Sequence, residues 1–238
     1  MTVRGDGAWK GGVHAILRSG VRRYGRIAAM DLPVADSWAR IAAWLTANSP
    51  TAAECVLPPV PPEAVNRVAA EFDGHLPADL LRWWQCMGGV TTDTAVAFVL
   101  PPGYLPYPPD EALLAWRQGL ALMSESGTDA DAGGVAGAGG TAFDRRFLPI
   151  ATDTCGQMLY LDLRSGDLYG CVMEWDPESP NPGCPMWPNV AAMLADTAAA
   201  MTDSIPALSE HAERMRRLGL WCDPATVMVD SDGTIEWE

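Results

Sequence analysis

Two hydrophobic periodicities occupy different parts of this chain. Before residue 126, apolar residues recur mainly at the spacing of one buried helix face, whereas residues 147–175 hold three short apolar segments separated by turn residues. Helical and strand patterns are therefore segregated rather than strictly alternating. This segregation favours an α+β fold in which an antiparallel β-sheet meander is covered by helices.

The first half of the chain predicts four helices. They are expected at about residues 37–48, 62–74, 77–88 and 110–125. Asp36 or Ser37 is expected to cap the first of them, and Pro62 suits the first turn of the second. Between the third and fourth helices, the β-branched, apolar residues 94–102 predict a short buried strand that ends at its two prolines.

The second half of the chain begins with the strand signals. Strands are expected at about residues 147–152, 157–163 and 168–175. In the middle strand, Leu159, Leu161 and Leu163 alternate with more polar positions, which predicts one strongly apolar face. Helices at 187–201 and 205–219 follow, and Asp232-Gly233 between apolar residues predicts a terminal hairpin.

These patterns divide the chain into three parts. Residues 1–30 predict a loose N-terminal arm, residues 31–203 the main domain, and residues 204–238 an extension made of a helix and a hairpin. Residues 126–142, rich in Gly, Ala and Asp, predict a flexible surface loop within the domain. Because composition changes abruptly at Met30, we also hypothesise that the first 29 residues are a mis-assigned upstream extension.

The charge balance indicates which partners to expect. The chain has 30 acidic residues against 16 basic ones, a net charge of -14, and six of the bases lie within the first 26 residues. Such a surface repels nucleic acid and attracts basic partners over a long range. The alternative is that acidity simply improves solubility. Arginine outnumbers lysine fifteen to one, which suggests a bacterial coding sequence rich in G and C.

Targeting and metal signals are missing from the sequence. The opening residues lack the apolar segment of a secretory signal, and no segment approaches the roughly 20 apolar residues of a membrane span, so a cytoplasmic protein without membrane contact is expected. The six cysteines form no C-x-x-C pair, which argues against a zinc site. The glycines at 133–140 lack the Lys-Ser or Lys-Thr of a phosphate-binding loop, so we expect neither a metal nor a cofactor.

Residues that could support catalysis are few. His14, His75 and His211 belong to no recognisable nucleophile-base arrangement, and an ordinary surface role is the expectation for each. Cys155 lies in a predicted turn without the motif of a cysteine nucleophile. Residues 230–233 resemble the opening of a calcium loop, but the chain ends too soon for one, so a hairpin turn is favoured. We therefore expect no catalytic residues.

A group of acidic and aromatic residues is the candidate surface for a protein partner. Trp175, Asp176, Glu178 and Trp187 flank the loop that follows the third strand of the meander, and Asp153 follows the first strand. Aromatic side chains beside a loop can anchor a partner. The alternative is that the tryptophans close the hydrophobic core.

Several motifs, taken in order, resemble those of the SUKH superfamily, which includes the yeast cell-wall-synthesis regulators and many bacterial toxin-immunity proteins. Leu76-Pro77 with Asp79, and then Gly88-Gly89, resembles the family's helix motif. The segments LPPGYLPYPPDEALLAW, FLPIATDTCGQMLYLDLRSGDLYGCVMEW and WPNVAAMLADTAAAM resemble the elements that follow it. The resemblance spans about Trp38 to Met201. Gln157 departs from it, because many relatives have an acid there, and residues 126–142 are an insertion.

The resemblance implies a single α+β domain with a bent antiparallel sheet covered by helices, and no conserved catalytic apparatus. It also implies protein binding. The first expectation is a bacterial immunity protein that neutralises a cognate toxin, such as a basic nuclease. The second is an intracellular scaffold or regulatory module comparable in role to the yeast regulators. An enzyme would require a pocket that collects Cys155 with a histidine or with several acids. The sequence does not specify the toxin or the oligomeric state.

Overall fold

A computed structural model describes residues 34–238, except residues 92–94, 129, 131–132, 141 and 180. The predicted arm at residues 1–30 lies outside the described residues. Leu32–Glu238 form one compact unit. Its elements in chain order are α2 (Val34–Asn48), α3 (Pro50–Glu54), α4 (Pro62–Glu71), α5 (Ala78–Trp84), β1 (Leu105–Pro106), α6 (Pro109–Glu125), β2 (Phe147–Thr152), β3 (Met158–Asp162), β4 (Cys171–Trp175), α7 (Val190–Asp203), α8 (Ser209–Arg217), β5 (Val227–Val229) and β6 (Ile235–Trp237).

The helices form where the apolar spacing predicts them, with one addition and three later or earlier starts, at α2, at α7 (Val190 instead of about 187) and at α8 (Ser209 instead of about 205). α2 begins at Val34, so the predicted cap is wrong: Asp36 lies in the first turn, and Ser37 is buried within the helix. The added helix, α3, begins directly after α2 because Ser49 caps it by accepting the N–H of Ala52. Pro62 occupies the first turn of α4, as predicted.

Four strands form an antiparallel meander in the order β1-β2-β3-β4. Each strand pairs with the next in sequence, and Leu148 faces Leu161 across the β2–β3 pair. The pairing shifts between Pro149 and Ala151 in β2, and such an irregularity bends a strand locally. Together with the seven described helices, this sheet confirms the predicted α+β class.

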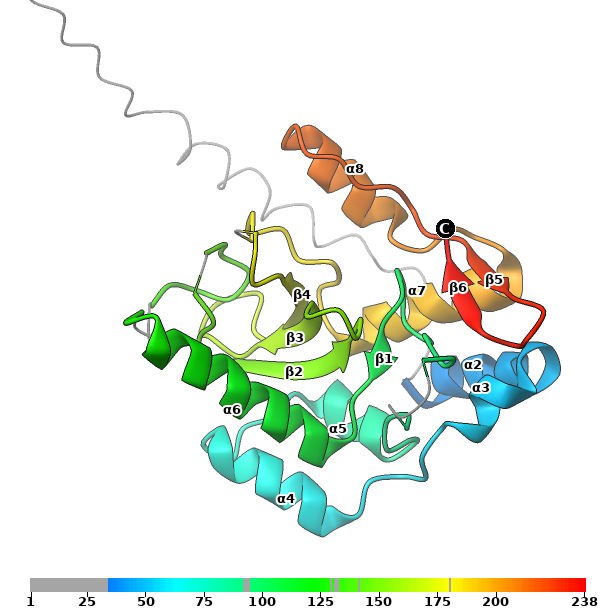
Figure 1. Ribbon diagram of the computed structural model, residues 1–238, viewed down its shortest axis with the longest axis horizontal. Coiled ribbons are helices and arrows are strands. Elements are labelled where there is room, and N and C mark those ends of the chain that lie inside the picture. Colours follow the sequence, from blue (N-terminus) through cyan, green and yellow to red (C-terminus); the bar gives the residue numbers. More distant parts are fainter. Residues whose placement is uncertain (1–33, 92–94, 129, 131–132, 141, 180) are drawn as a thin grey trace, which may run out of the picture. The chain divides into compact units, whose positions relative to one another are not determined.

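Both faces of the sheet are covered, although the sequence predicted one strongly apolar face. Tyr160 and Asp162 in β3 are buried as completely as their neighbours Leu159 and Leu161. α6 contacts β2, and α7 contacts β4 (Figure 1). On the second face, the ring of Phe147 stacks on Tyr160 with centroids 4.1 Å apart. Simple alternation missed this because the segment that covers the second face lies elsewhere in the sequence.

A buried ion pair joins the segment around Gly137 and Ala138 to the sheet. Asp162 accepts hydrogen bonds from the side chain of Arg164, at 2.9 Å from Nε and 2.7 Å from Nη2. Asp162 also accepts the N–H of Gly137 at 2.8 Å, while Arg164 donates to the carbonyl oxygen of Ala138 at 2.7 Å. Flexibility of residues 126–142 stays a prediction, but these contacts tie Gly137 and Ala138 to the sheet.

The strand predicted at residues 94–102 does not form. Residue 94 lies outside the described part, Ala95 and Val96 lie in a turn, and Leu100 makes a single bridge with Tyr104. The chain reverses there, because the N–H groups of Gly103 and Tyr104 both donate to Leu100 O. Pro101 and Pro102 supply no N–H, so a strand ladder cannot continue through them. The segment is irregular, and only part of it, including Ala97, Val99 and Leu100, is buried as its apolar character indicates.

The C-terminal hairpin packs on this irregular segment. β5 and β6 pair as the sequence predicts. The N–H of Ile235 donates to Val96 O at 3.0 Å, and the indole of Trp237 donates to Phe98 O at 2.7 Å. Ser49 also donates its hydroxyl to Gly233 O. Residues 204–238 therefore contribute to the core of the unit rather than lying apart from it.

Candidate functional site

Three carboxylates gather at one end of the sheet. Asp153 follows β2, Glu174 is the fourth residue of β4, and Asp176 follows β4. Because the strands are antiparallel, the end of β2, the start of β3 and the end of β4 meet at the same edge. Gln157, just before β3, links the group by donating to Asp176 Oδ2 at 3.2 Å. We call Asp153, Glu174 and Asp176 the carboxylate cluster.

Asp153 shapes the turn on which it lies. Its Oδ1 accepts backbone N–H bonds from Cys155, Gly156 and Gln157, at 2.8, 3.0 and 2.9 Å. These bonds hold a turn in which Thr154 takes a left-handed conformation, with φ 69°. Asp153 is therefore a structural residue of the turn as well as a member of the cluster.

The surroundings of Glu174 disfavour the ionised form of its carboxyl group. Burial raises the pKa of its carboxyl group, and the nearby carboxylates of Asp176 and Asp153 raise it further. The hydrogen bond from the hydroxyl of Tyr104, at 2.6 Å, lowers the pKa and only partly opposes this. A positive charge placed here would be strongly attracted.

The described part of the chain does not provide that positive charge. None of the ion pairs between described residues includes Asp153, Glu174 or Asp176. By contrast, most of the described arginines are paired with a carboxylate elsewhere on the unit. Within the described residues, the cluster is therefore a negative site without a compensating positive charge.

A small pocket of about 140 Å³ opens beside the cluster and brings a cysteine and a histidine together. Cys184 Sγ lies 3.8 Å from His211 Nδ1, but that nitrogen also lies 3.1 Å from Pro185 O and carries its proton toward this oxygen. Burial raises the pKa of Cys184 and lowers that of His211, so both neutral forms are favoured. A cysteine nucleophile needs the thiolate, and this pair does not produce one.

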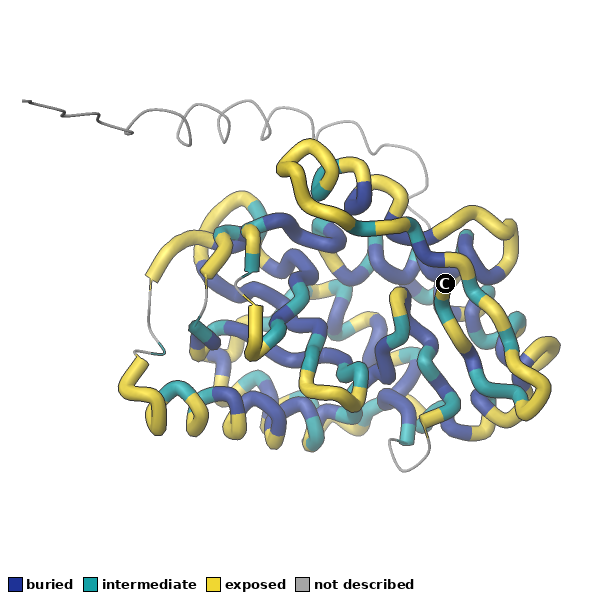
Figure 2. Tube along the Cα trace, turned by 45° about the horizontal axis from the view of Figure 1, so that its top comes forward, coloured by how far each residue is buried: buried dark blue, intermediate teal, exposed yellow. Residues whose placement is uncertain are grey.

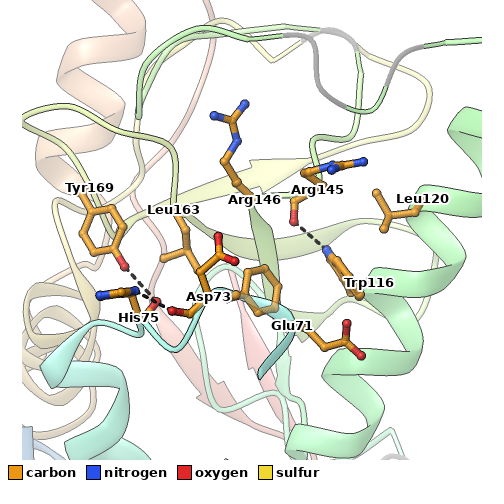
Figure 3. A pocket seen from close by; sticks show the side chains of 10 residues that line it. Glu71, Asp73, His75, Trp116, Leu120, Arg145, Arg146, Leu163 and Tyr169 are labelled. Atoms are coloured by element: carbon orange, nitrogen blue, oxygen red, sulfur yellow. Dashed lines mark hydrogen bonds between the residues drawn. The ribbon is translucent and has the colours of Figure 1, made fainter. Parts of the chain in front are cut away.

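A larger pocket of about 420 Å³ lies between the end of α4, α6 and the turn before β2 (Figure 3). Several of its polar groups bond to protein atoms: the hydroxyl of Tyr169 donates to His75 O, and the indole of Trp116 donates to Arg145 O. Glu71 pairs with Arg117. No serine, threonine or cysteine is among its described lining residues, so it offers no hydroxyl or thiol nucleophile of the usual kind.

The five residues predicted to bind a partner occupy two different environments. Trp175 and Trp187 are buried: the ring of Trp175 packs edge-on against Phe143, and the indole of Trp187 donates to Asp196 at 2.8 Å. Their side chains therefore belong to the core beneath this end of the sheet and not to its surface. Asp153 and Asp176 are partly exposed, and Glu178 is exposed. A partner-binding role for this group stays a prediction, which the three acidic residues are placed to fulfil.

Sequence reasoning missed two members of this region. Glu174 lies within an otherwise apolar strand. The available signal was a single acid between Met173 and Trp175. Tyr104 lies 70 residues away in sequence, and only the return of the chain before β1 brings it to Glu174. No sequence pattern marks that contact.

Metal binding and membrane insertion also bear on function. Among the described residues, no group of three or more histidine, cysteine, aspartate or glutamate side chains is arranged to hold a metal ion. No helix in the described ranges combines the length and apolarity needed to cross a bilayer.

Comparison with known proteins identifies the family. The family model for the SMI1 / KNR4 family (SUKH-1) matches residues 59–196, a segment that contains the whole meander and the carboxylate cluster. A search of curated proteins gives no match. The motif resemblance over Trp38 to Met201 includes the matched segment and is confirmed. Since the match extends over more than half of the chain, this protein belongs to the SMI1 / KNR4 family (SUKH-1).

Proposed function

We propose that this protein is a non-enzymatic, protein-binding member of its family that acts as a bacterial immunity protein, neutralising a cognate toxin with a basic surface in the cytoplasm. The observation that carries the proposal is the carboxylate cluster, which no arginine of the described chain compensates. A basic partner that supplies this charge would remove the repulsion among the three acids and gain specificity.

The charge of the whole unit supports the same partner. Residues 34–238 contain 28 acidic residues and ten arginines, without lysine or any other strong base. A unit with this imbalance attracts a basic protein over a long distance and accelerates their encounter. It repels nucleic acid. Protection by binding and shielding the toxin's nucleic-acid substrate is therefore an unsuitable mechanism. Neutralisation by covering a basic surface of the toxin fits the charge.

The first test is capture of the partner from the native cell. Tagged protein is recovered from lysate, and bound proteins are identified by mass spectrometry. One stoichiometric basic partner, whose toxicity is suppressed when both genes are co-expressed, supports the immunity role. Several unrelated housekeeping partners would instead favour an intracellular scaffold or regulatory module, and the absence of any bound protein would contradict both.

A pair of charge variants then tests the surface. Asp176→Asn with Glu178→Gln removes two negative charges beside the cluster and keeps Asp153, which holds its turn. We expect binding of the captured partner to weaken about tenfold, with a smaller dependence on salt. Glu54→Gln with Glu63→Gln removes the same charge from α3 and α4 and is the matched control. Equal weakening by both pairs would mean that only net charge matters.

A further inference from the structure

Trp221 differs from every other described tryptophan. The others, eight in number, are buried or half-buried, whereas Trp221 is 86% exposed. Leu218 and Leu220 beside it are 51% and 40% exposed. Figure 2 shows the exposed residues of this region at the end of α8 and after it. A tryptophan side chain left in water forgoes the large stabilisation that its burial would bring, so its position needs an explanation.

The local backbone holds this exposed segment in place. α8 ends at Arg217, and Gly219 takes a left-handed conformation with φ 76°. The N–H of Gly219 donates to Arg216 O at 3.1 Å, and that of Leu220 donates to Met215 O at 3.0 Å. This pair of bonds is the Schellman arrangement that closes helices in many proteins. The segment is therefore a fixed turn rather than a frayed helix end.

The indole of Trp221 is also oriented. Its Nε1 donates to the carboxylate of Asp223 at 3.1 Å. A side chain that is held by its polar end and leaves its ring in water loses little entropy when a partner covers the ring. Leu218, Leu220 and Trp221 form what we call the Trp221 turn. It lies outside residues 59–196, which the family model matches.

The Trp221 turn borders the carboxylate cluster. Met215, whose carbonyl oxygen holds the turn, lines the same small pocket as Glu174 and Asp176. Cys222 directly follows Trp221. Burial raises the pKa of its thiol, and the charges of Glu174 and Asp223 raise it further, which places Cys222 in the field of the cluster. Of the bases on α8, Arg214 donates to Pro185 O and Met186 O and pairs with Glu210, Arg217 pairs with Glu213, and Arg216 is exposed.

We propose that the Trp221 turn is the apolar anchor of the partner-binding surface, and that the partner presents an amphipathic segment with an apolar residue over Trp221 and a cation toward Glu174 and Asp176. This inference rests on the proposed function. A second copy of this chain is a poor occupant, because it would bring a second acidic unit against the first. Exposed tryptophans at such positions commonly dominate binding energy.

Two synthetic peptides test the proposal without the natural partner. One is a helical peptide with leucine on one face and lysine on the other, and the second has serine in place of leucine at the same charge. We expect the wild-type protein to bind the leucine peptide more tightly by fluorescence anisotropy. Trp221→Ala should reduce that binding about tenfold and leave the serine peptide unaffected. Leu122→Ala, which removes an exposed leucine from α6, should change neither.

The outcomes separate the two proposals. If the wild-type protein binds neither peptide, the acidic partner surface itself is refuted, and the anchor with it. If it binds both but Trp221→Ala binds the leucine peptide as tightly as the wild type, the anchor alone is refuted. A wild-type dimer in sedimentation that Trp221→Ala abolishes would show that a second copy covers the turn, which also overturns the proposed occupant. Thermal unfolding of each variant should match the wild type.

Discussion

Two carboxylates on neighbouring strands of the meander have opposite environments. Asp162 in β3 is fully buried, yet it accepts hydrogen bonds from three donor groups of Arg164 and from the N–H of Gly137. Glu174 in β4 is half-buried and has one hydrogen-bond donor, Tyr104, with two further acids nearby. The more deeply buried charge is therefore the better satisfied one.

This difference separates a structural charge from a candidate binding charge. A charge is costly to bury unless it is paired, so Asp162 and Arg164 are held together by the fold itself. For Glu174 and Asp176, no cation among the described residues relieves their repulsion. Binding sites often retain such unfavourable charges at a cost in stability, because the partner relieves them. Four variants test this contrast.

The largest effect is expected for Asp162→Ala. It leaves the guanidinium of Arg164 buried without its anion, and removing one partner of a buried pair costs about 3–5 kcal/mol of the free energy of unfolding. Urea unfolding measures the loss. Asp110→Ala breaks the exposed pair with Arg67 and should cost less than about 1 kcal/mol. A loss for Asp162→Ala as small as that of Asp110→Ala would contradict the structural role.

A double replacement sharpens this result. Asp162→Leu with Arg164→Met removes both charges and keeps apolar volume at the site. Because an apolar pair can replace a buried ion pair with little loss, most of the stability lost in Asp162→Ala should return. Failure to recover it would indicate that Gly137 and Ala138, which bond to the pair, need its charges to hold their segment.

The second effect concerns that segment. Gly137 has φ 80°, and a Cβ on it would lie 2.6 Å from Leu168 Cδ1. Gly137→Ala should therefore reduce the free energy of unfolding by about 1–2 kcal/mol, through backbone strain and through displacement of Leu168. Gly133→Ala is the matched control. Gly133 has φ 75°, but a Cβ added to it would meet no atom within 4 Å. Equal losses would mean that strain alone operates and that the contact is unimportant.

The smallest effect, and the only gain, is expected for Glu174→Gln. The folded state raises the pKa of Glu174, so its ionised form destabilises the fold once the pH exceeds the usual value of 4.5. The amide removes this penalty and can still accept the hydrogen bond from Tyr104. The variant should be more stable than the wild type at pH 7, and the two should converge as the pH falls toward 4.5. Thermal unfolding across this range is the measurement.

The same variant separates stability from binding. If Glu174 is retained for a partner, Glu174→Gln should bind the lysine-containing peptides less tightly although it is more stable. Glu236→Gln, on the exposed side of β6, is the control and should change neither property. A variant that is destabilised at pH 7 would show that Glu174 is a structural charge like Asp162.

The candidate site was only partly predictable. Asp153 and Asp176 stand out in the sequence because they follow strands, and antiparallel pairing brings such positions to one edge. Trp175 and Trp187 were expected at a partner surface or in the core, and burial placed them in the core. Trp221 gave no periodic signal, since it follows the glycine that ends α8. Its exposure became evident only when the other described tryptophans were found to be buried or half-buried.

The sequence by itself determined the α+β class, the order of the three longer strands of the meander, most helix positions and the family, because local periodicity and turn residues encode these features. The tertiary structure alone decided that both faces of the sheet are buried, that Arg164 pairs with Asp162, and that Tyr104 meets Glu174. These features depend on contacts between segments far apart in the chain. Local spacing carries no information about which distant segment supplies a charge, and for Glu174 the described residues supply none.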